Sequence, residues 1–429
     1  MIINADCLDH LKTLPDNTVD CLVTDPPYGI EFMGKDWDKS IPSVDIWKEC
    51  LRVLKPGAFG YIFCIPRQDC LSRMMMSLEQ AGFNINFSSI YWTYANGFPK
   101  ALNIGKAIDK RAGVKGKEVI RQDFYDRSNK KECEMKQVPC GTKGVYNLPA
   151  TPEAKKLEGS YGGFQPKPAV EIIIVVMEPL SKNSYIDQAL DNGKGVTWLD
   201  DCRIPFADEK DEKCMNLNNG YGTTGYFKEK DEPENYDYRF SVNSSCRFPA
   251  NLLVSDDVLD GGIERSSSYS RYFDLDKWAV EKGVKDTFPF LICPKASKSE
   301  KNSGCEKLEK ENGMFDKYFA NFCKICNKRG DVCKCKNPEY EKKSIEVLPN
   351  SNKHPTVKPI KVMSYLITMG SREGDVILDP FAGSGTTGCA AILLRRKYIL
   401  IEMDKEYVEI IKARVKYHTE FMQEQPMKI

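Results

Sequence analysis

Short apolar runs alternate with amphipathic segments at both ends of this 429-residue chain. Runs of strand length cover residues 19–24, 58–64, 88–92, 376–378 and 398–402. Helix-like patterns cover residues 47–54, 70–81, 359–369 and 386–394, and a last one starts at Lys405. Such alternation is typical of a mostly parallel sheet covered by helices. We therefore predict a doubly wound, Rossmann-like α/β fold that draws strands from both ends of the chain.

The middle of the chain lacks this periodicity. Residues 115–164 and 208–238 are polar and rich in glycine and tyrosine, which indicates loops or insertions outside the sheet. Between them, residues 172–177 form an apolar run with Glu171 at its mouth, and we expect this strand to rejoin the sheet. Gly57 and Gly82 are predicted to end the two helices of the first half.

Composition excludes some classes of protein. Hydrophobic residues make up 41% and charged residues 29%, as in globular proteins, and no apolar run approaches the roughly 20 residues needed to cross a bilayer. The first residues lack signal-peptide features, so we expect a cytoplasmic protein without membrane contact. The formal charge of +1 argues against a basic coat but permits a local basic groove for nucleic acid. The 17 dispersed cysteines are expected to be reduced.

The motif Asp25-Pro26-Pro27-Tyr28 directly follows the first predicted strand. The amine of a nucleobase is a poor nucleophile until acceptors bind its hydrogens, and the Asp25 carboxylate and the Pro26 carbonyl are suitable acceptors. The prolines fix the backbone, and the Tyr28 ring is suited to stacking on an extruded base. The alternative is a turn that simply ends a strand.

A second motif, Asp379-Pro380-Phe381-Ala382-Gly383-Ser384-Gly385-Thr386-Thr387, follows a strand and opens a helix. Gly383 and Gly385 permit close approach of a ligand, and a helix N-terminus favours a carboxylate. About twenty residues later, Glu402 ends the next strand, where an acidic side chain suits ribose hydroxyls. Glycines of an ordinary turn are the alternative.

In this order the two motifs resemble the amino-group DNA methyltransferases that use S-adenosylmethionine, in the subclass whose catalytic motif precedes the cofactor motif. His354-Pro355-Thr356-Val357-Lys358-Pro359 is similar to that family's segment before the cofactor half. The matching stretches, 1–110, 165–205, 245–300 and 352–415, look like methylases common in phages and prophages. The resemblance implies a circularly rearranged methyltransferase sheet.

The resemblance also implies roles for individual residues. Asp25, Pro26, Pro27 and Tyr28 would be catalytic. The cofactor-binding residues would be Asp6, near the adenine, Glu402, on the ribose, and Asp379, Phe381, Gly383, Gly385, Thr386 and Thr387. The two threonines would bind the methionine carboxylate or cap the helix. Lys358 would approach the cofactor or the DNA backbone, or be solvated, and Trp37 would line the base pocket or pack in the core.

The implied reaction is methylation of the N6 amine of adenine in double-stranded DNA with a flipped target base. Asp25 favours adenine, because cytosine-amine enzymes of this family more usually have serine at that position. Cytosine-N4 methylation, an RNA or protein-glutamine methylase, and a non-catalytic zinc-containing DNA-binding protein are the alternatives. The resemblance leaves open a homodimer and a restriction enzyme as partner. Pro139-Cys140 is expected to be ordinary, because the other features of cytosine-C5 enzymes are missing.

Four cysteines form two close pairs, Cys323 with Cys326 and Cys333 with Cys335. Two close pairs of thiolates suit tetrahedral zinc, so we predict a small zinc knuckle at about residues 320–338. Unligated thiols are the alternative, and His354 or Cys305 are candidates to replace one ligand.

These observations divide the chain into four parts. The predicted catalytic half covers residues 1–110, and the predicted cofactor half covers 352–415. Residues 111–351 would hold the target-recognition insertions, the strand near 170–177 and the zinc knuckle, and residues 416–429 a tail.

Overall fold

The computed structural model describes residues 1–30, 38–93, 101–116, 118–120, 145–164, 170–205, 246–254, 296, 298–305, 308, 317–323, 340–346 and 352–424. The chain forms two compact units. The larger unit comprises Met1–Asn96, Val170–Leu308 and Ser351–Ile429, and the smaller one comprises Gly97–Ala169 and Glu309–Asn350.

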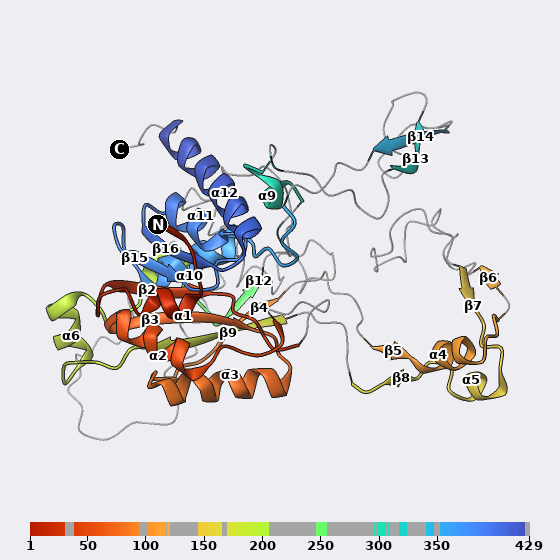
Figure 1. Ribbon diagram of the computed structural model, residues 1–429, viewed down its shortest axis with the longest axis horizontal. Helices are drawn as coiled ribbons and strands as arrows, with labels where there is room; N and C mark the ends of the chain where they lie inside the picture. Colours follow the sequence, from red (N-terminus) through yellow and green to blue (C-terminus); the bar gives the residue numbers. More distant parts are fainter. Residues whose placement is uncertain are drawn as a thin grey trace, which may run out of the picture. The chain divides into compact units, whose positions relative to one another are not determined.

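An eight-stranded sheet organises the larger unit (Figure 1). Its strands, in spatial order, are β1 (Ile2–Asn4), β16 (Lys397–Glu402), β15 (Val376–Asp379), β2 (Val19–Thr24), β3 (Leu54–Cys64), β9 (Val170–Met177), β4 (Ile90–Thr93) and β12 (Leu252–Val254). All neighbouring pairs are parallel except those of β9, which is antiparallel to both β3 and β4. The predicted mostly parallel sheet is thus confirmed, and strands from both chain ends meet at its centre.

Helices cover both faces of this sheet, and each face has its own apolar core. The described helices of the larger unit are α1 (Cys7–Leu11), α2 (Val44–Val53), α3 (Gln68–Ala81), α6 (Tyr185–Asn192), η4 (Leu199–Cys202), α9 (Lys298–Asn302), α10 (Ile360–Gly370), α11 (Thr386–Leu393) and α12 (Lys405–Glu424). Leu11, Trp47 and Met74 place α1, α2 and α3 on one core, whereas Met363 and Ala390 place α10 and α11 on the other. No described helix is long and apolar enough to span a membrane.

Gly57 differs from its predicted role. Gly82 does end α3 in the left-handed conformation, but Gly57 lies inside β3, at the register shift between β2 and β3. Its φ is +81°, and a Cβ there would lie 2.7 Å from the Gly195 amide nitrogen. The signal that seemed to end a helix therefore marks a bulge where a second backbone segment approaches.

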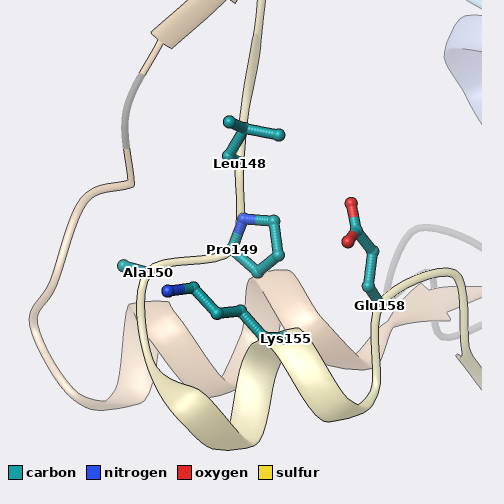
Figure 2. Close-up of a pocket in the computed structure, with 5 residues that line it drawn as sticks. All are labelled: Leu148, Pro149, Ala150, Lys155 and Glu158. Atoms are coloured by element: carbon teal, nitrogen blue, oxygen red, sulfur yellow. The ribbon is translucent and has the colours of Figure 1, made fainter.

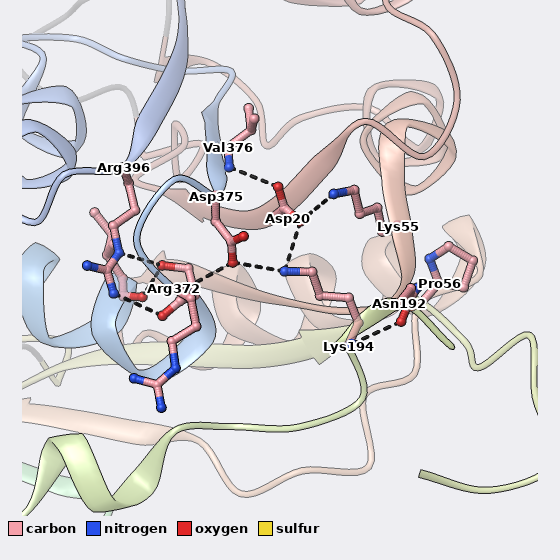
Figure 3. A network of polar contacts seen from close by, with 11 residues as sticks. Asp20, Lys55, Pro56, Asn192, Lys194, Arg372, Asp375, Val376 and Arg396 are labelled. Carbon is pink, nitrogen blue, oxygen red and sulfur yellow. Dashed lines mark hydrogen bonds and ion pairs between the residues drawn. The ribbon is translucent and has the colours of Figure 1, made fainter. Parts of the chain in front are cut away.

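Ion pairs tie the strands together at the amino edge of the sheet (Figure 3). Asp20 Oδ1 of β2 lies 2.6 Å from the Lys55 ammonium and 2.8 Å from the Lys194 ammonium. The Lys194 ammonium also lies 2.9 Å from Asp375 Oδ2. The other Asp20 oxygen accepts the Val376 amide. Burial raises the pKa of Asp20, but the hydrogen bonds from Lys194 and Lys55 outweigh it and lower that pKa overall. The starts of β2 and β15 are thereby connected.

The smaller unit contains short elements that the sequence pattern did not predict. They are β5 (Leu102–Asn103), α4 (Ile104–Arg111), β6 (Glu118–Ile120), β7 (Val145–Asn147), α5 (Pro152–Lys156), β8 (Tyr161–Gly162), β13 (Lys317–Cys323) and β14 (Tyr340–Glu346). Asp109 fixes the start of α5, because its carboxylate accepts the Ala150 and Thr151 amides. A separate two-stranded sheet, β10 (Ile204–Pro205) with β11 (Cys246–Arg247), belongs to the larger unit.

Candidate active site

Three neighbouring parallel strands end at one edge of the sheet. Asp25 follows β2, Phe381 follows β15, and Glu402 ends β16. Because β15 pairs with both β2 and β16, residues more than 350 positions apart in the chain share this edge. The sheet therefore brings the Asp25 motif and the Phe381 motif together.

Hydrogen bonds lock the turn after β2. The Tyr28 hydroxyl donates to Asp25 Oδ1 at 2.5 Å, and the amides of Tyr28 and Gly29 both donate to Asp38 Oδ1, at 2.7 and 3.0 Å. Burial and the charge of Asp25 raise the pKa of Tyr28 well above its usual value, so the phenol stays a neutral donor. Asp25 and Tyr28 are partly exposed, whereas Pro26 is buried.

Lys358 is not solvated, which was one of the alternatives predicted for it. It is buried, and its ammonium lies 2.5 Å from Asp25 Oδ2 and 3.2 Å from Glu171 Oε2. Glu171 reaches this edge because β9 runs antiparallel, which puts the start of β9 beside the end of β3. The only sequence signal for a role of Glu171 was its position at the start of an apolar strand. The antiparallel direction of β9 is not visible in the sequence pattern.

Asp379 points into the protein. It is buried and accepts hydrogen bonds from Thr24 Oγ1 at 2.7 Å, Thr387 Oγ1 at 2.6 Å and the Phe381 amide at 3.1 Å. Burial raises its pKa to about 6, although these donors act in the opposite direction. Its contacts connect the ends of β2 and β15, which is a framework role within the cofactor motif.

The residues that open α11 are also turned inward. Gly385, Thr386 and Thr387 are buried, and Thr386 Oγ1 accepts Arg414 Nη1 at 3.0 Å. A Cβ on Gly385, whose φ is +75°, would lie 2.9 Å from Ile411 Cγ2. Packing against α12 therefore explains this glycine, and neither threonine side chain caps α11.

Four other residues of the predicted cofactor side keep some exposure: Asp6, Phe381, Gly383 and Glu402. Glu402 accepts the Gly383 amide at 2.8 Å and the Asp404 amide at 2.9 Å, and burial raises its pKa to about 7. Asp6 caps α1 through the Leu8 and Asp9 amides. Asp6 follows β1, which pairs with β16, so both carboxylates lie near one edge.

These residues fit S-adenosylmethionine. A carboxylate at the end of β16 suits ribose hydroxyls, and each Glu402 oxygen keeps a lone pair after binding its backbone amide. The partly exposed Phe381 ring, which packs edge-on against Trp47 at a centroid distance of 6.0 Å, provides an apolar wall.

His354 lies on the cofactor motif. A Cβ on Gly383 would stand 2.7 Å from His354 Nε2, and the imidazole packs edge-on against Tyr407 at 4.6 Å. Burial lowers the pKa of His354 to about 4. Packing against a glycine turn is thus its evident role here, and the alternative of a zinc ligand finds no support in this contact.

Several predicted positions lie outside the described residues: Trp37, Cys140, Cys326, Cys333 and Cys335. Cys323 ends β13, and Cys305 is buried. Among the described side chains, no cluster of three or more His, Cys, Asp or Glu is arranged to hold a metal ion.

A cavity of about 440 Å³ lies in the smaller unit (Figure 2). It is lined by residues before, within and after α5: Leu148, Pro149, Ala150, Lys155 and Glu158. It contains no residue of either motif.

Comparison with known proteins finds similarity to DNA methylases. Residues 209–413 match the DNA methylase family model, a range that includes Phe381 and Glu402 but not Asp25. The type II methyltransferase M2.MboI of Moraxella bovis is 43% identical over 95 residues, which are 20% of this chain and 34% of that protein. The DNA adenine methyltransferase YhdJ of Escherichia coli K12 is 41% identical over 76 residues, 18% of this chain and 26% of its own length.

The chain thus spans about a third or less of the length of these curated relatives. Among solved structures, the PvuII DNA methyltransferase (cytosine-N4-specific) aligns over 99% of this chain and 93% of its own, with 13% identity and a TM-score of 0.41. By the family model and the sequence relatives, this chain is similar to the amino-group DNA methyltransferases that use S-adenosylmethionine.

Proposed function

We propose that this protein transfers a methyl group from S-adenosylmethionine to the N6 amine of adenine in double-stranded DNA. The observation that carries the proposal is the partly exposed Asp25 carboxylate, which lies at the same sheet edge as Glu402, two strands away. At this separation, a base bound to Asp25 and a cofactor whose ribose is bound to Glu402 would meet between the two carboxylates.

Asp25, Pro26 and Tyr28 would act on the base. The Asp25 carboxylate and the Pro26 carbonyl accept the hydrogens of the extruded amine, which localises the nitrogen lone pair for in-line attack. Tyr28 stacks on the base after it leaves the duplex. No covalent enzyme intermediate is required, so these residues act by positioning and electrostatics.

Glu402, Asp6, Phe381 and Gly383 would hold the cofactor at the ends of β16, β1 and β15. Bound S-adenosylmethionine supplies an electrophilic methyl group on a sulfonium. Asp379, Gly385, Thr386 and Thr387 would support that site from behind, because they are buried against β2 and α12.

The target base and the activity have one direct test. Methylation-deficient bacterial DNA is incubated with the protein and S-adenosylmethionine, and its nucleosides are analysed by mass spectrometry. We expect N6-methyladenine, because position 25 is aspartate and because the relative YhdJ is named as an adenine enzyme. N4-methylcytosine would assign the alternative target, and absence of cofactor binding would favour a DNA-binding protein without catalysis.

The domain arrangement is part of the proposal. Residues 1–110 and 352–415 would form the two halves of a circularly rearranged methyltransferase domain. Residues 111–351 would hold the target-recognition insertions and the zinc knuckle, together with sheet strands such as β9. The pairing of β2 with β15 and of β1 with β16 supports this assignment of the two halves. The enzyme would work in the cytoplasm of a bacterial or phage-infected cell, where its DNA substrate lies. A homodimer and a partner restriction enzyme belong to the same proposal.

We also propose a structural zinc held by Cys323, Cys326, Cys333 and Cys335. The antiparallel pair β13 and β14 supports it, because Cys323 pairs with Tyr340 and the ends of the intervening stretch are thereby brought together. Elemental analysis of the purified protein should find about one zinc per chain, and Cys326→Ser should lower that content. Metal-free protein of normal stability would contradict the proposal.

A further inference from the structure

Both oxygens of the Asp25 carboxylate are occupied. Oδ1 accepts the Tyr28 hydroxyl at 2.5 Å, and Oδ2 accepts the Lys358 ammonium at 2.5 Å. An amine that is to be activated by Asp25 must therefore displace at least one of these donors, because a carboxylate already bound to a cation is a weaker acceptor.

The Lys358 ammonium has a second carboxylate within reach. It lies 3.2 Å from Glu171 Oε2, and the side chains of Lys358, Asp25 and Glu171 are 9%, 18% and 13% exposed. Among the described residues, Glu171 Oε2 is a buried oxygen without a hydrogen bond of good geometry. The lysine ammonium thus has one short contact, with Asp25, and one longer contact, with a second acceptor on Glu171.

The lysine also remains charged. Burial would lower the pKa of Lys358, but the charges of Asp25 and Glu171 outweigh this effect and raise the pKa above its ordinary value. The rings of Tyr28 and Phe63, at 5.8 and 5.2 Å from the ammonium, line the space around it. Asp25 and Glu171 share the one Lys358 ammonium. Movement of the ammonium from one carboxylate to the other therefore leaves the total charge of the three groups unchanged.

We infer that Lys358 is a positioning residue that exchanges between two carboxylates: it holds Asp25 while the base site is empty and moves to Glu171 when the target amine binds Asp25. The inference rests on the proposed function. Glu171, which lies outside both motifs, would accept the Lys358 ammonium and so free Asp25 to bind the base.

The test compares two identical substitutions at the two ends of β9. Glu171→Gln removes the charge that receives Lys358, whereas Glu178→Gln makes the same change just beyond the other end of the strand. Single-turnover methylation of methylation-deficient DNA is measured with radiolabelled S-adenosylmethionine, together with cofactor affinity by calorimetry and DNA affinity by fluorescence anisotropy.

Glu171→Gln should lower the single-turnover rate at least about tenfold, since Lys358 is then retained on Asp25, while both affinities change less than about twofold. Glu178→Gln should leave all three values unchanged. A lysine that merely orients Asp25 would predict an unchanged or faster rate for Glu171→Gln, because the short contact survives, and that result would overturn the exchange.

A second variant guards against a purely structural effect of Glu171. In the Lys358→Met background, Glu171→Gln should no longer lower the rate, because Glu171 acts through Lys358. An equal loss in both backgrounds overturns the inference while leaving the proposed function intact. A wild-type protein that binds no S-adenosylmethionine and methylates no DNA overturns both, so the two failures are distinguishable.

Discussion

The two ends of β2 each carry an aspartate bound to lysine, and the two clusters differ in charge balance. At the amino edge, Asp20 and Asp375 face Lys55 and Lys194, two carboxylates with two ammonium groups. At the carboxyl edge, Asp25 and Glu171 share the single Lys358. Five residues, or about 17 Å of strand, separate the two aspartates.

This difference separates a structural cluster from a functional one. The Asp20 cluster is neutral as a set, and its second Asp20 oxygen is filled by the Val376 amide, so a ligand has little to add. The Asp25 cluster holds one excess negative charge beside a partly exposed tyrosine, which suits a site for an amine and a sulfonium cation. Incomplete neutralisation, more than burial of charge, marks the site.

The largest expected effect comes from Asp25→Ala. Removing the acceptor carboxylate should lower the methylation rate by on the order of 10³-fold or more, because the amine lone pair is no longer localised. Affinity for S-adenosylmethionine, measured by calorimetry, should stay within about twofold, since the cofactor side belongs to β15 and β16. Substantial remaining methylation would contradict the assignment of Asp25.

Asp20→Ala is the matched change at the other end of β2. It removes the contact of Asp20 with Lys55 and leaves Lys194 with Asp375 alone. The free energy of unfolding should therefore fall by about 3 kcal/mol. Urea denaturation measures that loss, and the rate per folded molecule should stay at the wild-type value. Asp45→Ala, which removes an exposed pair with Lys48, serves as the control and should cost about 0.5 kcal/mol or less. A folded but inactive Asp20→Ala protein would break the comparison.

Sequence patterns predicted the central strands and their helices because local periodicity carries that information. They did not predict the direction of β9, since an apolar run looks the same in a parallel and an antiparallel strand. The contact between Lys358 and Asp25 joins residues 333 positions apart, and the contact between Lys358 and Glu171 depends on the reversal of β9. The resemblance implied a cofactor role for Asp379, and no local pattern could show its hydrogen bond to Thr24, which follows from tertiary packing.

The raised pKa of Glu402 provides a test of function at the carboxyl edge of the sheet. Burial raises that pKa to about 7, so the carboxylate is ionised above pH 7 and becomes protonated as the pH falls through 7. The ionised form is the better acceptor for ribose hydroxyls, so the Kd for S-adenosylmethionine should rise about tenfold between pH 8 and pH 6. Glu402→Gln should bind about tenfold more weakly at pH 8 and lose this pH dependence. Calorimetry across pH 6 to 8 measures both, and a flat wild-type profile would exclude Glu402 from ribose binding.

Glu178 has a similarly raised pKa at the amino edge, where no cofactor is expected. Burial raises the pKa of Glu178 from 4.5 to about 7, and its Oε2 is buried without a hydrogen bond among the described residues. The folded state therefore binds this proton more tightly than the unfolded state does. The stability of the wild-type protein should accordingly fall as the pH rises from about 4.5 to about 7.

Glu178→Gln removes that cost because the amide stays neutral. Its free energy of unfolding should match the wild type near pH 4 and exceed it by about 1 kcal/mol at pH 8. Urea denaturation at the two pH values measures the difference, with the exposed Glu79→Gln as a control that should show none. Affinity for S-adenosylmethionine should be unchanged, in contrast to Glu402→Gln. If Glu178→Gln were instead less stable than the wild type at pH 8, the wild-type Glu178 carboxylate would have a favourable ionic contact. The raised pKa values of Glu402 and Glu178 would then no longer distinguish a functional edge of the sheet from a structural one.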